Sequence, residues 1–183
     1  MRLFFSQRIP EFKRVLLVES GSRYLIESLL PRIYKEHGPH IHLDIVTCYA
    51  GQPAEFDPAR GAVYHVTGYQ GAEGRSRLYK VLDAARYDIT GIVCSGEPVM
   101  TKWKWMLAAR LPAKLFILNE NGDYFWCHYA NWLTIQHFVL FRAGLSGAGA
   151  IDTLVRMAVL PLTLAYLLAY AAIAHTRRRL RTS

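Results

Sequence analysis

The sequence has few cysteines, and none of them are closely spaced. Cys48, Cys94 and Cys127 are odd in number and include no C-x-x-C pair. This pattern argues against a disulfide framework or a cysteine zinc site, and it fits a reducing compartment. The seven histidines also lack the spacing of metal ligands, so we expect no metal site.

Glycine-rich nucleotide fingerprints are also missing. The chain contains neither a G-x-G-x-x-G run after a strand nor the lysine of a P-loop. Their absence weighs against a nucleotide-dependent oxidoreductase or methyltransferase. No spacing typical of an RNA- or DNA-binding motif is present either, so we do not expect a nucleic-acid partner.

Acidic residues are scarce beside basic ones. There are 14 Asp and Glu against 22 Lys and Arg, which gives a net charge of +8. Four of the positive charges lie in one short run near the C-terminus: Arg177, Arg178, Arg179 and Arg181. A basic cluster beside an apolar segment is typical of attraction to anionic lipid. The sequence therefore indicates a membrane surface as a partner.

That apolar segment covers residues 157–174 and carries no charged side chain. Its length is at the lower end of the roughly 17–25 residues that cross a bilayer as a helix. A spanning helix with the basic tail inside would need the domain to be exported, and residues 1–10 contain no signal-peptide core. The reverse orientation would place the arginines outside, against the charge rule. A helix bent at Pro161 that enters and leaves by one face keeps them inside. We favour this arrangement at the cytoplasmic face of the cell membrane; the alternative is a helix buried in the core or in a dimer.

Apolar runs alternate with helix-period segments along the rest of the chain. Alternation of this kind predicts an α/β domain, because right-handed crossovers place helices on the faces of a parallel sheet. We expect strands at 14–18, 42–47, 62–67, 89–94 and 114–118, in a five-stranded parallel Rossmann-like sheet of order 3-2-1-4-5. The predicted parts are an N-terminal lead (1–12), the α/β domain (13–142), a hinge (143–152), a membrane-associated helix (153–176) and a basic tail (177–183).

Ligands of such sheets bind beyond the carboxyl ends of the strands, where the strand order reverses. The loops after the first and fourth strands should meet there. Glu19 and Glu97 would then approach each other, and paired carboxylates can supply a general base. The other candidate ligand-binding residues of these loops are Ser20, Gly21, Ser22, Arg23, Ser95 and Gly96. The alternative is an ordinary turn capped by Ser22, with Glu97 placed to complement a helix dipole.

Two further groups of residues are candidates. The polar loop after the fifth strand, with Asn119, Glu120, Asn121 and Asp123, suits sugar hydroxyls or a ribose, although its Asn-Gly step also predicts a simple turn. Tryptophans favour the boundary between water and lipid. We therefore expect membrane contact from Trp103, Trp105, Trp126 and Trp132, with core packing as the alternative for some of them.

Three stretches carry a resemblance to a known family: RVLLVESGSRYLIESLLPRIYKEHGPHIHLDIVT, ARYDITGIVCSGEP and LPAKLFILNENGDYFW. Together they resemble the N-terminal, acceptor-side half of GT-B glycosyltransferases, the heptosyltransferase-like group in particular, over about residues 13–126. The Gly-Asp pair of that family appears here as Gly21-Ser22, so its aspartate base has no counterpart. Glu19 would be a substitute on geometry alone. The family's second, donor-binding domain is absent from this sequence.

The chain also looks like the membrane-anchoring subunit of a two-chain glycosyltransferase. That resemblance implies a nucleotide-sugar donor held by a catalytic partner subunit or in a homodimer, a polyprenyl-linked acceptor, and no other cofactor. Our first hypothesis is a membrane-associated, glycosyltransferase-like protein of surface-glycan assembly, with Glu19 or Glu97 as the base. The alternative is a non-catalytic, membrane-anchored binding or scaffold module.

Overall fold

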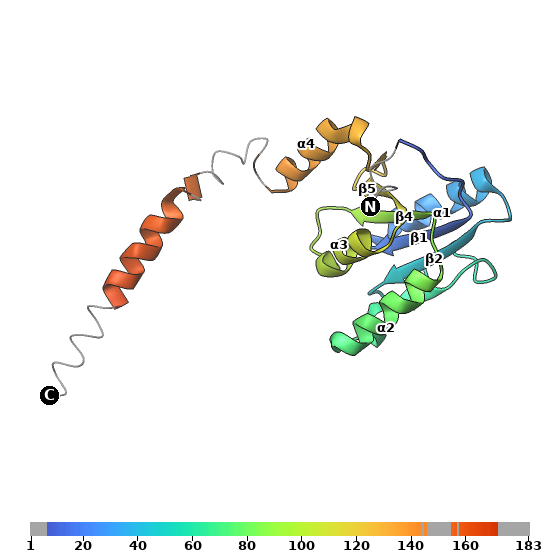
Figure 1. The fold of residues 1–183 in the computed structure, drawn as a ribbon, viewed down its shortest axis with the longest axis horizontal. Helices are drawn as coiled ribbons and strands as arrows, with labels where there is room; N and C mark the ends of the chain where they lie inside the picture. Colours follow the sequence, from blue (N-terminus) through green and yellow to red (C-terminus); the bar gives the residue numbers. More distant parts are fainter. Residues whose placement is uncertain (1–6, 144, 146–154, 157, 172–183) are drawn as a thin grey trace. The chain divides into compact units, whose positions relative to one another are not determined.

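The computed structural model describes residues 7–143, 145, 155–156 and 158–171. Two compact units divide the chain, residues 1–132 and 133–183. The first unit is an α/β domain (Figure 1). Its elements, in chain order, are β1 (Arg14–Glu19), α1 (Arg23–His37), β2 (His42–Thr47), β3 (Val63–His65), α2 (Gly71–Ala84), β4 (Ile89–Cys94), α3 (Thr101–Arg110), β5 (Lys114–Asn119) and β6 (Tyr124–Trp126), with a 3-10 turn, Val66–Gly68, after β3.

The sheet has the order β3-β2-β1-β4-β5-β6. The first five strands are parallel, so the expected order 3-2-1-4-5 is confirmed. The expectation of five strands is wrong, because β6 adds a sixth strand that pairs antiparallel with β5. The predicted strand at 62–67 is also shorter than expected, since only Val63–His65 pair with β2.

A tight turn explains the sixth strand. The side-chain Oδ1 of Asn119 accepts hydrogen bonds from the backbone N–H of Asn121 (3.0 Å) and Asp123 (2.9 Å). Gly122 adopts a φ of 79°, which glycine reaches without strain. The chain therefore reverses at once after β5, with no crossover helix, and the aromatic segment Tyr124–Trp126 forms an edge strand.

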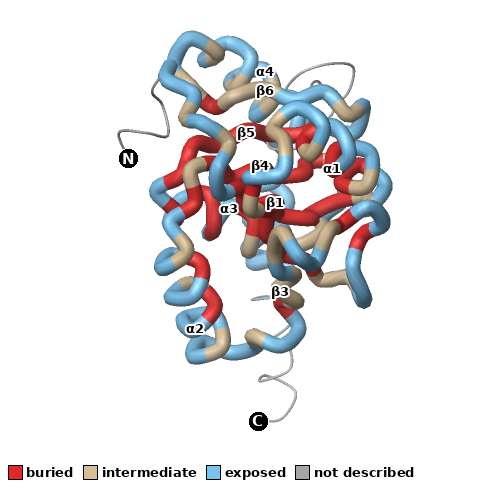
Figure 2. Tube along the Cα trace, turned by 90° about the vertical axis from the view of Figure 1, so that its right-hand side faces the viewer, coloured by how far each residue is buried: buried red, intermediate tan, exposed pale blue. Residues whose placement is uncertain are grey.

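Helices cover both faces of the sheet. Helix α1 packs on β1, and α3 packs on β4. Figure 1 shows α2 and α3 on one side of the strands and α1 on the other, as right-handed crossovers require. Buried positions concentrate in the central strands (Figure 2). On the α1 side the core joins Leu17, Leu30, Ile45 and Phe116, among others.

Two buried charged side chains of this domain, Asp44 and Lys114, have hydrogen-bond partners, whereas the buried Thr90 hydroxyl has none among the described residues. The Asp44 carboxylate accepts hydrogen bonds from the Tyr87 hydroxyl (2.5 Å) and the Ala62 amide (2.7 Å). Lys114 is fully buried at the start of β5, and its Nζ donates to the Cys127 carbonyl at 2.9 Å. Burial lowers the pKa of Lys114, because a low-dielectric interior disfavours the charged ammonium. These bonds tie β2 to the segments that precede β3 and β4, and β5 to the segment after β6.

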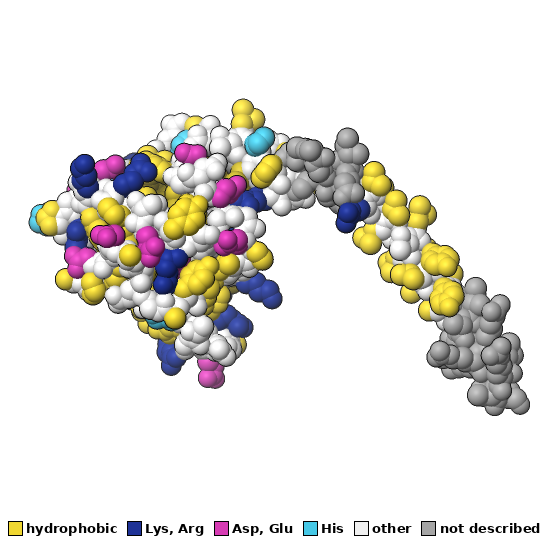
Figure 3. Space-filling model, turned by 180° about the vertical axis from the view of Figure 1, so that it is seen from behind, with side chains coloured by type: hydrophobic (Ala, Val, Ile, Leu, Met, Phe, Trp, Pro, Cys, Tyr) yellow, Lys and Arg dark blue, Asp and Glu magenta, His cyan; other side chains and the backbone are white. Residues whose placement is uncertain are grey.

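The second unit is helical where it is described. Helix α4 spans Trp132–Arg142, beginning at the last residue of the first unit, and residues 158–171 form another helix. The large apolar side chains of that C-terminal helix are exposed, among them Leu160 (66%) and Leu162 (70%) (Figure 3). Within the described ranges, no helix combines the length and apolar character needed to cross a bilayer. The four arginines of the basic tail lie outside the described residues.

Gly91 gives a test of the core. A Cβ at this position would lie 2.7 Å from Cε1 of Phe116 and 2.8 Å from Cδ2 of Leu17. We expect Gly91→Ala to lower the free energy of unfolding by about 1–3 kcal/mol through overpacking, measured by urea denaturation. Gly68→Ala is the matched control, because a Cβ there meets nothing within 4 Å. Equal stability of the two variants would contradict the packing described here.

Candidate functional site

The loops after β1 and β4 lie against each other at the carboxyl edge of the sheet. The Ser22 amide donates to Oγ of Ser95 at 3.3 Å, and the Ser20 hydroxyl donates to the Val93 carbonyl at 2.7 Å. Gly21 has no room for a side chain, because a Cβ there would overlap Ser95 Oγ. The structure thus brings together the two loops that flank the point where strand order reverses.

Glu19 is held by an ion pair. Its side chain is fully buried, and its Oε1 accepts a hydrogen bond from Nε of Arg23 at 2.8 Å. The second oxygen receives Nη2 of Arg23 at 3.4 Å, and Nη1 of the same guanidinium donates to the Ala50 carbonyl at 2.9 Å. The hydrogen bond to Glu19 raises the pKa of Arg23. Both carboxylate oxygens of Glu19 are therefore engaged within the protein, and Arg23 acts as their partner.

Glu97 is placed differently. It is exposed, and its Oε1 accepts a hydrogen bond from the Ser22 hydroxyl at 2.9 Å. Ser22 stands at the N-terminal end of α1. Glu97 is thus the carboxylate of the predicted pair that solvent or a ligand can reach, while Gly96, with a φ of 78°, shapes the loop that carries it.

Tyr49 joins this site from the loop after β2, and the sequence analysis missed it. Its hydroxyl donates to the Gly21 carbonyl at 3.1 Å, and the Arg23 guanidinium lies 5.3 Å from its ring centre. Burial raises the pKa of Tyr49, and the charges of Cys48, Glu97 and Glu19 raise it further. The charges of both carboxylates of the predicted pair therefore act on the Tyr49 hydroxyl. Ligands of parallel sheets bind beyond the carboxyl ends of the strands. Tyr49 follows the carboxyl end of β2, so the same rule could have predicted it from the sequence.

The loop after β5 reaches the same edge. The Tyr24 hydroxyl, in the first turn of α1, donates to the Glu120 carbonyl at 3.0 Å. Asn119 uses its side-chain oxygen to hold the turn, as described above. Asn121 and Asp123 are exposed. Of the four predicted polar residues, Asn119 thus serves the turn, and the other three line its outside.

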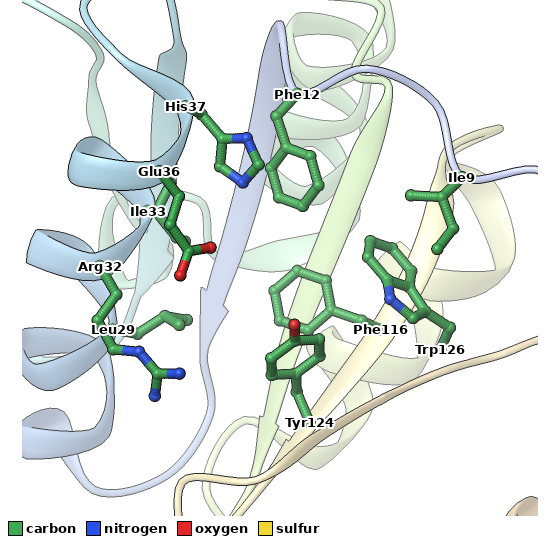
Figure 4. A pocket seen from close by; sticks show the side chains of 10 residues that line it. All are labelled: Ile9, Phe12, Leu29, Arg32, Ile33, Glu36, His37, Phe116, Tyr124 and Trp126. Atoms are coloured by element: carbon green, nitrogen blue, oxygen red, sulfur yellow. The ribbon is translucent and has the colours of Figure 1, made fainter.

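The predicted membrane-contacting tryptophans do not share one surface. Trp103 and Trp105 line a groove of about 890 Å³ between α2 and α3, together with Arg75, Lys102 and Arg110. Trp126 lines a separate cavity on the α1 side of the sheet (Figure 4). Trp132 is exposed at the junction between the two units.

The α2/α3 groove is basic and aromatic. None of its lining residues is acidic. Trp105 is exposed, and Trp103 contacts Tyr79 with ring centres 5.6 Å apart. The Arg110 guanidinium lies 4.6 Å from the centre of the Tyr79 ring. Lys104, in contrast, is buried and does not belong to this surface.

No cluster of three or more His, Cys, Asp or Glu side chains that could hold a metal ion occurs in the part of the chain that the structure describes. Cys127 is buried, and burial raises the pKa of its thiol to about 12. A protonated, buried thiol is a poor nucleophile, so Cys127 belongs to the core.

The Glu19–Arg23 pair gives a test of the site's architecture. Arg23→Gln leaves a fully buried carboxylate without its cation, so we expect the free energy of unfolding to fall by about 2–3 kcal/mol. This is less than for a completely buried pair, because the Arg23 side chain is 26% exposed. Urea denaturation measures the loss. The double variant Glu19→Gln/Arg23→Gln should recover part of it, and a double variant less stable than Arg23→Gln would contradict this account.

No protein-family model, curated protein or solved structure matches this chain.

Proposed function

We propose that this chain is a membrane-associated, glycosyltransferase-like protein that acts on a lipid-linked or surface-glycan acceptor. The observation that carries the proposal is the exposed Glu97 carboxylate, bound to the Ser22 hydroxyl where the strand order reverses. Ligands of parallel α/β sheets bind at this place. A carboxylate there can accept the proton of an acceptor hydroxyl as that oxygen attacks the anomeric carbon of a nucleotide-sugar. The bond from that carbon to the phosphate oxygen breaks, and the nucleoside phosphate leaves.

Of the two predicted carboxylates, Glu97 suits the role of base better. Glu19 would have to give up a hydrogen bond to Arg23 before it could accept a proton, and it is fully buried. Glu97 is exposed, and the Ser22 hydroxyl uses only its Oε1, whereas Arg23 uses both oxygens of Glu19. We therefore assign proton acceptance to Glu97, and positioning of the loop after β1 to the Glu19–Arg23 pair.

The nucleotide-sugar donor would come from elsewhere. The first unit is one α/β domain, and its sheet has one point where the strand order reverses. A donor-binding half supplied by a partner chain, or by a second copy of this chain, would complete the reaction. Asn121 and Asp123, exposed outside the turn after β5, would contact the acceptor sugar.

Two features support attachment to a membrane surface, which we propose is the cytoplasmic face. The helix at 158–171 exposes large apolar side chains. Exposed apolar surface of this kind marks a site of contact with lipid or with another protein. The α2/α3 groove combines three cations with two tryptophans, the chemistry that suits the headgroup layer of an anionic bilayer.

A second candidate is a non-catalytic, membrane-anchored scaffold module. The protein's own groups partly fill the carboxyl edge, since Ser95 takes the Ser22 amide and Arg23 takes Glu19. Thermal unfolding with nucleotides and nucleotide-sugars separates the two functions. A binder gains about 2.7 kcal/mol at a ligand concentration of 100 Kd, and a scaffold gains nothing.

Glu97→Gln tests the catalytic assignment. With purified chain, a candidate donor-binding partner, a nucleotide-sugar and a polyprenyl-linked acceptor, we expect sugar transfer to fall by about 10²–10⁴-fold, because a general base is lost. Glu11→Gln is the control, since Glu11 is exposed and lies before β1, at the opposite edge of the sheet. Unchanged transfer by Glu97→Gln would remove Glu97 from the mechanism.

Lys102→Glu tests the membrane surface. We expect binding to phosphatidylserine-containing vesicles to weaken by about 2 kcal/mol, because an attraction of about 1 kcal/mol is lost and a similar repulsion is gained. Co-sedimentation measures it, with phosphatidylcholine vesicles as reference. Lys35→Glu is the matched control, because it makes the same charge reversal on α1, away from the groove. If both variants weaken binding equally, the groove is not the contact surface.

A further inference from the structure

The α1 side of the sheet carries a cavity that the proposed reaction does not use. Its volume is about 230 Å³, and it lies between α1 and the β5–β6 hairpin (Figure 4). The cavity exists because the chain turns straight from β5 into β6, so no crossover helix covers this part of the sheet. Its position is distinct from the carboxyl edge that holds Glu97.

The floor of the cavity is aromatic. Phe116 makes edge-on contacts with Tyr124 (ring centres 5.9 Å apart) and with Trp126 (5.5 Å). Phe12 contacts Trp126 edge-on at 6.0 Å and stacks on the His37 ring at 3.8 Å. Gly91 makes room for the Phe116 ring, so the floor is built into the core of the sheet.

Polar groups surround this floor and have no partner within the described chain. Arg32 and Glu36 lie one turn apart on α1 and line the cavity, and no hydrogen bond or ion pair joins either side chain to another described residue. The Tyr124 hydroxyl likewise has no such bond. Figure 4 shows the Glu36 carboxylate and the Tyr124 hydroxyl on the cavity side of the aromatic floor.

This combination selects the chemical class of ligand. A pyranose ring presents an apolar C–H face that packs on aromatic rings, and hydroxyls at its edge that both donate and accept hydrogen bonds. Glu36 accepts, Arg32 donates, and Tyr124 does both. An acyl chain would leave these groups unused, and a phosphate would be repelled by Glu36. At roughly 30 Å³ per water, the cavity holds the volume of about eight waters, which fits one ring.

We infer that this cavity binds a single neutral pyranose unit of a glycan. The inference deepens the proposed function, because it gives the glycan acceptor a second contact away from the transfer site. With one sugar unit bound on the α1 side, the protein would hold a glycan of several units while another unit of that glycan binds at Glu97. Binding here requires no sugar transfer, so the inference and the proposed function can fail separately.

Saturation-transfer NMR on the full chain tests it, with methyl glucoside, methyl galactoside and methyl mannoside as probes. At least one should bind. Glu36→Ala and Arg32→Ala should weaken binding by about tenfold, because a hydrogen bond to a charged group is lost, and Tyr124→Phe should weaken it several-fold. Lys35→Ala, on the same helix but outside the lining, should leave binding unchanged.

Two further probes identify other occupants. Cyclohexanol has the ring without the hydroxyls, and sorbitol has the hydroxyls without the ring, so both should bind more weakly than the glycoside. Cyclohexanol binding that is unaffected by Glu36→Ala would show that the cavity is an apolar site without sugar recognition, and it would overturn the inference. Failure of all three glycosides to bind would also overturn it.

Glu97→Gln separates the two proposals. It should bind the glycoside as the unsubstituted chain does, because Glu97 does not line this cavity. Transfer activity without glycoside binding here would overturn the inference and leave the proposed function standing. Glycoside binding without transfer would do the reverse.

Discussion

Strand β1 is paired on both sides, with β2 and with β4, and every other feature of the domain depends on that constraint. Because β1 is central, the chain adds β2 and β3 on one side of it, crosses the sheet, and then adds β4 and β5 on the other side. The loops after β1 and β4 consequently leave the sheet side by side. Gly21 permits their contact, and Ser22, Ser95 and Glu97 link them through hydrogen bonds.

The same constraint separates two environments for two glutamates. Glu19 ends a strand that is buried on both faces, so its charge needs an internal cation, which Arg23 supplies one helical turn later. Glu97 follows β4 in a loop that faces solvent. Two side chains of one type at one edge of the sheet therefore take different roles, the first structural and the second available for chemistry.

The far side of the sheet is shaped by the way β5 ends. Because Asn119 and Gly122 form a tight turn, the chain forms an antiparallel edge strand in place of a sixth parallel strand. This leaves a cavity between α1 and the rings of Phe116 and Trp126. The direct turn from β5 into β6 thus creates the aromatic cavity. Helices α2 and α3 cover the opposite face of the sheet and form the basic groove.

Local pattern by itself determined the class of fold. Strands β1, β2, β4 and β5 are buried at nearly every position, and each carries a short run of apolar residues, as strands covered on both faces do. Their parallel pairing and order therefore followed from the sequence. The three-residue strand β6 was missed because its aromatic residues match a membrane rim as well as a strand. Only the tertiary structure decided that Glu19 is sequestered and Glu97 exposed, since both follow similar strands. It alone also assembled Phe12, Glu36 and Trp126 into one cavity, because contacts between residues so distant in the chain leave no mark on local pattern.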